Sequence, residues 1–205
     1  MALITRRAAI QTATAALSLA LARPASAQAI DRIGVPGPLS FAGTRYSLAW
    51  SANPKPNYYK QEYLPAGQTP ERYERMLLVE LLDGGSDVAA AAGTQVRAIN
   101  ARKGSDPLAN LAVIENRQRG EIIVDFLIGG GDAQGGEIAE WNAYRYAPFR
   151  SAPGRDGVLL FAISHRAYGD EAIKAFLGKL KAFRPGEIQR LAGQTLPTPA
   201  LSPGR

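Results

Sequence analysis

Apolar and polar residues alternate along several short stretches of the chain, which is typical of half-buried β-strands. The first stretch covers residues 44–52, where Tyr46, Leu48 and Trp50 fall on one face. Residues 58–64 repeat the pattern after a loop with two prolines, so these two strands are expected to form a hairpin. Four further strands are predicted, at residues 108–116, 121–128, 137–146 and 157–165.

Helical periodicity predicts two helices in the remaining sequence. Residues 87–102 place their apolar side chains near one face. A second helix begins near Asp170 and carries an apolar stripe. Pro185 either ends it or starts a short extra turn through Leu191.

A third, shorter helix is expected to begin after Thr69, whose side chain can cap it, with Pro70 in the first helical position. Residues 77–82 are apolar almost throughout, so they fit either the end of that helix or a buried strand. We predict that the short helix passes into a strand there.

The predicted fold is α+β, with an antiparallel sheet of six or seven strands and two or three helices packed on one face. An extended arm at residues 28–40 precedes a single domain at residues 41–193. Residues 194–205 contain three prolines and are predicted to form a disordered tail. The order of elements is similar to the sandwich of PsbP-type extrinsic photosystem subunits, at the level of topology only.

The amino-acid composition excludes several kinds of catalytic and metal site. The 205 residues include no cysteine and one histidine. These counts exclude disulfides, cysteine nucleophiles, thiolate metal sites and histidine-rich metal centres. We therefore expect neither a bound metal nor a cofactor.

Residues 1–27 have the pattern of an export signal: a basic head, a weakly apolar stretch and a small-residue cleavage site at Ala25 and Ala27. Arg6 and Arg7 after a threonine resemble the twin-arginine (Tat) signal family, although the positions that follow match its pattern only in part. A general secretory (Sec) signal is the alternative. Either export machinery would be a partner and would deliver the mature chain to the periplasm or outside the cell.

Removing this signal lowers the formal net charge from +6 to +3, because three arginines leave with it. The chain has no run of five like charges, so nucleic-acid binding is not expected. The apolar stretch at residues 13–22 is about half of the roughly 20 residues that cross a bilayer, so no membrane anchor is predicted.

Few residues suggest catalysis. His165 follows Ser164 on a strand, but alternation sends the two side chains to opposite faces. The glycines at residues 129–136 lack the pattern of a phosphate-binding loop and are expected to connect two strands. Carboxylates such as Glu62 could serve acid–base chemistry only in a cleft, which a sequence does not reveal.

Aromatic residues point more clearly to binding. They gather in the first hairpin and around a later strand, together with basic residues that suit an anionic or sugar-like ligand. The predicted ligand-binding residues are Trp50, Tyr59, Trp141, Tyr144, Arg145 and His165.

Residues 62–69, with Tyr73 and Met76, resemble a segment of small exported bacterial proteins to which we attach no activity. Three hypotheses follow. The favoured one is a non-enzymatic binding or accessory module for a small molecule or another envelope protein. The alternatives are a small periplasmic hydrolase that uses carboxylates with His165, and a structural envelope component.

Overall fold

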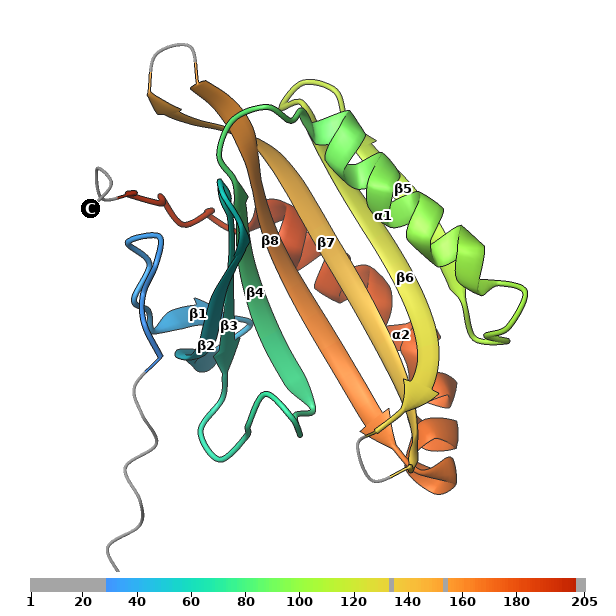
Figure 1. The fold of residues 1–205 in the computed structure, drawn as a ribbon. Helices are drawn as coiled ribbons and strands as arrows, with labels where there is room; N and C mark the ends of the chain where they lie inside the picture. The colour runs from blue at the N-terminus through green and yellow to red at the C-terminus, as the bar shows by residue number, and fades with distance from the viewer. Residues whose placement is uncertain (1–28, 133–134, 153–154, 202–205) are drawn as a thin grey trace, which may run out of the picture.

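The computed structural model describes residues 29–132, 135–152 and 155–201, which form one curled antiparallel sheet of eight strands with two helices (Figure 1). The strand order is β1-β2-β3-β4-β8-β7-β6-β5. The predicted sheet of six or seven strands with its helices on one face is therefore wrong. An eighth strand at residues 39–41 joins the sheet, and the helices pack on opposite faces. The likeness to a PsbP-type sandwich was part of this prediction and is wrong as well.

The first half of the chain forms the hairpin side of the sheet. Its strands are β1 (Leu39–Phe41), β2 (Thr44–Lys55), β3 (Tyr58–Leu64) and β4 (Arg75–Leu82). The second half adds four further strands and both helices. These are α1 (Val88–Arg102), β5 (Asn110–Asn116), β6 (Glu121–Gly131), β7 (Glu137–Ala152), β8 (Arg155–Tyr168) and the final helix α2 (Asp170–Gly193).

The two helices give the sheet an α1 side and an α2 side, and alternation along each strand sorts the side chains between them. On β7, Trp141 and Ala143 belong to the core beneath α2, whereas Tyr144 and Tyr146 pack in the core beneath α1. Figure 1 shows α1 in front of β6 and α2 behind the sheet. Both faces of the central strands are therefore buried.

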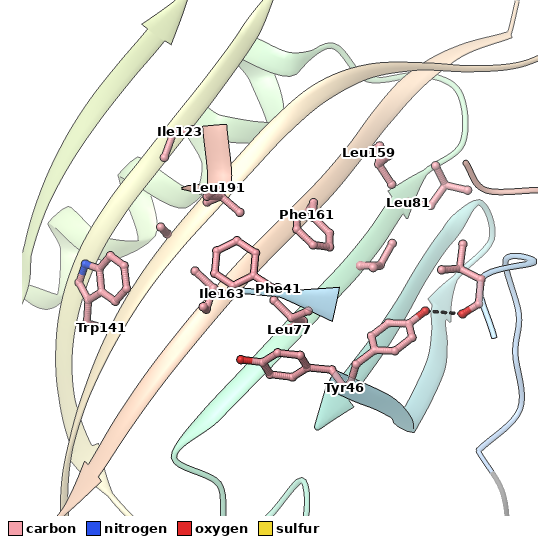
Figure 2. Close-up of a cluster of buried hydrophobic side chains, with 14 of the residues drawn as sticks. Phe41, Tyr46, Leu77, Leu81, Ile123, Trp141, Leu159, Phe161, Ile163 and Leu191 are labelled. Carbon is pink, nitrogen blue, oxygen red and sulfur yellow. Dashed lines mark hydrogen bonds between the residues drawn. The ribbon is translucent and has the colours of Figure 1, made fainter. Parts of the chain in front are cut away.

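The α2-side core joins segments that are far apart in the sequence. Figure 2 shows Phe41 of β1, Phe161 of β8 and Leu191 of α2 in one cluster with Trp141. All four side chains are buried. Burying a large side chain of this kind contributes about 1.5–3 kcal/mol, so this cluster holds β1, β7, β8 and α2 together.

Residues 75–82 form a strand and no helix precedes it in this described part of the chain, which corrects the prediction of a short helix after Thr69. Leu77 faces the α2-side core and Leu78 faces the α1-side core. A strand that is buried on both faces reads as a continuous apolar run, which periodicity alone cannot distinguish from a buried helix. Thr69 instead exchanges backbone hydrogen bonds with Arg72, at 3.1 and 3.0 Å.

Pro185 does not end the last helix, because α2 continues through it to Gly193. Helix α2 is therefore one continuous element, which includes the predicted helix and the residues of the predicted extra turn. The extra turns bring Leu191 into the α2-side core, where it is fully buried.

The tail beyond α2 packs against the N-terminal arm. The Ala200 backbone N–H donates to the Ile33 carbonyl oxygen at 2.8 Å, and Leu196 and Leu201 contact the α2-side core. Gly34 has φ +69°, and a Cβ there would lie 2.7 Å from the Ala200 oxygen, so glycine permits this close approach. The predicted disorder is thus wrong for residues 194–201.

The predicted export signal, with Arg6, Arg7, Ala25 and Ala27, lies outside the described residues. Among the helices that are described, none is long and apolar enough to cross a membrane.

Candidate ligand-binding site

A pocket of about 630 Å³ lies where the start of β4, the end of β8 and the first half of α2 meet. Antiparallel pairing places Arg75 of β4 directly opposite His165 of β8, and both line the pocket. Its volume falls within the range of small-molecule sites, roughly 300–1,000 Å³. The lining residues are Arg72, Glu74, Arg75, His165, Arg166, Ala167, Tyr168, Ala172, Ala175, Phe176 and Lys179.

The local sequence explains the α2 wall of this pocket. Gly169 has φ +73°, and this left-handed conformation turns the chain from β8 into α2. Residues at positions 172, 175, 176 and 179 then share one helical face. Two alanines and Phe176 make that wall apolar, while Lys179 ends it with an ammonium group.

The pocket is rich in cations that lack acidic partners. Among the described residues, Arg72, Arg75 and Lys179 form no ion pair. The Arg72 guanidinium lies 4.3 Å from the ring centroid of Tyr168 instead. Glu74 is the single carboxylate of the lining. The site therefore carries a local excess of positive charge.

Arg166 also lines the pocket but its charge is already balanced. Its Nε donates to Glu140 Oε2 at 2.5 Å, and its guanidinium lies 4.1 Å from the ring centroid of Tyr73. The Tyr73 hydroxyl donates to the same carboxylate at 2.6 Å. This network holds Arg166 in place, so the charge available to a ligand comes from the other cations.

His165 forms one end of the pocket. Its ring stacks on Phe183, with the centroids 5.4 Å apart, and meets the edge of Trp141 at the same distance. Its Nε2 lies 3.8 Å from Glu187 Oε2 and is the one buried side-chain polar atom without a hydrogen-bond partner in the described part of the chain. Nδ1 also has no partner among the described residues and is not fully buried.

Burial alone would raise the pKa of Glu187, but the hydrogen bond and charge of Arg190 and the nearby His165 outweigh it. The net effect is a pKa below the usual value for glutamate. Glu187 therefore stays ionised at neutral pH, 3.8 Å from the imidazole Nε2.

Of the six residues predicted to bind a ligand, only His165 lines this pocket. Trp141 and Arg145 are buried on the α2 side in structural roles, and Tyr59 packs against the same core. Tyr144 lies on the α1 side. Trp50 is 39% exposed on β2, so the structure does not bring the six together.

Trp141 and Arg145 each have internal partners. The Trp141 Nε1–H donates to Asp125 Oδ1 at 2.7 Å. Arg145 pairs with Glu121 and donates to the backbone oxygens of Leu191 and Gln194, at 2.9 and 2.7 Å. These bonds satisfy the two side chains and leave neither for a ligand.

The hydrolase hypothesis joined Glu62 with His165, and the two lie on opposite faces of the sheet. Glu62 pairs in register with Leu78, which faces the α1-side core. His165 contacts the aromatic rings on the α2 side. Burial raises the pKa of Glu62, with the charges of Glu80 and Glu140 acting in the same direction.

No group of three or more histidine, aspartate or glutamate side chains that could hold a metal occurs among the described residues. The glycine-rich segment begins inside β6 and, where described, lines no part of the pocket with His165. Residues 133–134 within it lie outside the described residues.

The three cations Arg72, Arg75 and Lys179 were not predicted from the sequence as site residues. Arg72 and Arg75 fell in the segment assigned to a helix, so their position opposite β8 was not expected. The spacing of Ala172, Ala175, Phe176 and Lys179 is a signal that could have indicated a second face of α2, which meets the core stripe at Phe176.

One protein-family model matches the chain over residues 33–196. The chain belongs to this family. The match runs from the arm through all the described strands and both described helices into the tail, so these parts form one unit of the family. No curated protein and no solved structure matches the chain.

Proposed function

We propose that this protein is an exported, non-enzymatic binding module that holds a small anion in the pocket between β4, β8 and α2. The observation that carries the proposal is the set of three cations, Arg72, Arg75 and Lys179, that line one pocket without ion-pair partners in the described structure. Cations gathered in this way repel one another, and a bound anion relieves that repulsion.

The ligand class follows from the groups that line the pocket. The guanidinium groups of Arg72 and Arg75 present fixed N–H donors suited to carboxylate or phosphate oxygens. The apolar wall of Phe176 and two alanines suits a short hydrocarbon portion beside the charged group. A small organic acid or a phosphate ester has this shared chemistry.

Binding without turnover fits the arrangement of the side chains. His165 Nε2 faces Glu187, and its ring is held between two other aromatic rings. No serine lines the pocket to act as a nucleophile. The residues that line it can orient and neutralise an anion.

Isothermal titration with inorganic phosphate and with succinate tests the proposal. The wild-type mature chain is expected to bind at least one of the two, and the affinity should fall as salt concentration rises. Arg75→Gln and Lys179→Gln should each weaken binding by about tenfold. Lys174→Gln is the matched control, since it removes the same charge from α2 at a position outside the pocket.

Unchanged affinity in both pocket variants would overturn the assignment of the site. Absence of a binding heat with both phosphate and succinate would overturn the ligand class. Native mass spectrometry of protein recovered from its producing cells then identifies the natural ligand as an added mass. Proton spectra of the ligand before and after incubation show whether it is chemically altered; an altered ligand would contradict the non-enzymatic part of the proposal.

A further inference from the structure

A second, apolar groove of about 630 Å³ runs between α2 and the free edge of the sheet. Helix α2 packs against β7 and β8, so the α2 side of β5 and β6 extends beyond it. Figure 1 shows β5 as the last strand of the sheet. The groove is lined chiefly by Ile114, Ile123, Leu177, Leu180, Pro185 and Ile188.

Ile114 is the exposed part of this apolar surface. Its side chain is 42% exposed, although isoleucine is among the residues most often fully buried. An apolar groove left in water costs roughly 25 cal/mol for each Å² that a ligand could cover. An apolar ligand that fills the groove would therefore gain free energy.

Two polar side chains of the groove, Asp125 and Arg184, are paired, whereas Gln189 and Lys181 are exposed and have no partner among the described residues. The Asp125 carboxylate accepts from Trp141 Nε1 and from Arg184 Nε, both at 2.7 Å. A peptide lying in the groove would bury more backbone N–H and C=O groups than the single Gln189 amide could satisfy. A hydrocarbon chain has no such groups, so the lining favours a chain over a peptide.

One charge at the groove remains free. Lys181 lines it and has no ion pair with any described residue, whereas Arg184 is neutralised by Asp125. A ligand with one apolar chain and one terminal negative charge matches this arrangement. The chain would lie along Ile114 and Ile188, and the charge would reach the Lys181 ammonium group.

We infer that the groove between β5, β6 and α2 binds a fatty acid, with its carboxylate paired to Lys181. This site is separate from the small-anion pocket and does not depend on the proposed function. Lys179 and Lys181 lie two positions apart on α2 and line different cavities, so variants of the two lysines distinguish the sites.

Titration with dodecanoate below its micelle concentration tests the inference, with the bound fraction followed by calorimetry. Ile114→Asn should weaken binding by about tenfold, since it removes apolar contact from the groove. Val113→Asn is the matched control. Val113 is 46% exposed on the same strand, but it pairs with Val124 and so faces the α1 side.

Removing the charge tests the position of the carboxylate. Lys181→Gln should weaken dodecanoate binding several-fold and leave dodecanol binding unchanged, while Lys179→Gln should alter neither. Circular dichroism confirms that each variant is folded. If Ile114→Asn fails to fold, Ile188→Ser on the opposite wall of the groove replaces it.

Absence of dodecanoate binding would overturn the inference, and so would equal losses in the Ile114 and Val113 variants. Sedimentation tests two other possible occupants of the groove, a second copy of the chain and a lipid surface. A dimer that dissociates on Ile114→Asn and excludes dodecanoate would assign the groove to a second copy of the chain. Co-sedimentation with vesicles, without binding of free dodecanoate, would assign it to a lipid surface.

Discussion

Arg145 and Glu121 form an almost fully buried ion pair, with Arg145 Nη2 2.7 Å from Glu121 Oε1. The same guanidinium donates to the backbone oxygens of Leu191 and Gln194, where α2 ends. One side chain on β7 therefore binds both the neighbouring strand and the end of the last helix. This role is structural, although the sequence suggested a ligand contact.

Replacing Arg145 should consequently destabilise the fold. Arg145→Met leaves Glu121 without its partner and the helix end without its donors, and is expected to lower the free energy of unfolding by about 3–5 kcal/mol. Urea denaturation measures the loss. Arg150→Met is the control, because Arg150 pairs with Asp156 on the exposed β7–β8 hairpin and should change stability little. Equal stability of the two variants would contradict the prediction.

Glu62 should make stability depend on pH in a defined direction. Burial raises the pKa of Glu62 in the folded protein above the usual value for glutamate, so the folded state holds this proton more tightly than the unfolded state does. Above the folded pKa, the buried charge disfavours folding. As pH falls through the folded pKa toward 4.5, that penalty is relieved.

Glu62→Gln should therefore stabilise the protein at pH 7 and lose its advantage below the unfolded pKa. Thermal unfolding of both chains across this pH range measures the difference. A variant that is less stable at pH 7 would show that Glu62 has a favourable partner when it is ionised.

Replacing Gly157 and Gly178 by alanine should change the free energy of unfolding in opposite directions. A Cβ at Gly157 would lie 2.1 Å from the Leu82 backbone oxygen, so Gly157→Ala must displace β4 from β8 and should cost about 3 kcal/mol. A Cβ at Gly178 in α2 meets no atom within 4 Å. Gly178→Ala should stabilise the helix by roughly 0.5–1 kcal/mol. Chemical denaturation of the two variants checks both signs.

Export should depend on the arginine pair at the start of the chain. Replacing Arg6 and Arg7 by lysine keeps the charge and removes the twin-arginine pattern. Under the Tat hypothesis, the double variant is expected to remain uncleaved in the cytoplasm, as seen by cell fractionation and the mass of the product. Normal export of the variant, with cleavage after Ala27, would favour the Sec route.

Alternation and spacing were sufficient for elements with one buried and one more exposed face. The strand predicted at residues 58–64 coincides with β3, and the helix predicted at residues 87–102 nearly coincides with α1. Periodicity failed where both faces are buried, as at Leu77 and Leu78 of β4. It also gave no information on which face of the sheet each helix would cover.

The candidate site was predictable only in part, because it depends on contacts between distant segments. His165 stood out as the single histidine, but Arg75 reaches it only through pairing of β4 with β8. Lys179 joins them because Gly169 turns α2 back across the sheet. Large aromatic residues were a poor guide to the site, since Trp141 is buried in the α2-side core.

The hydrogen bond from Ala200 to Ile33 has a consequence for where the chain can be truncated. Because this bond joins two segments that are far apart in the sequence, the α2-side core is complete only when the arm and the tail are both in place. A chain that is truncated directly after α2 would lack the contacts of Leu196 and Leu201. Its arm would then be more open to proteases than in the full chain.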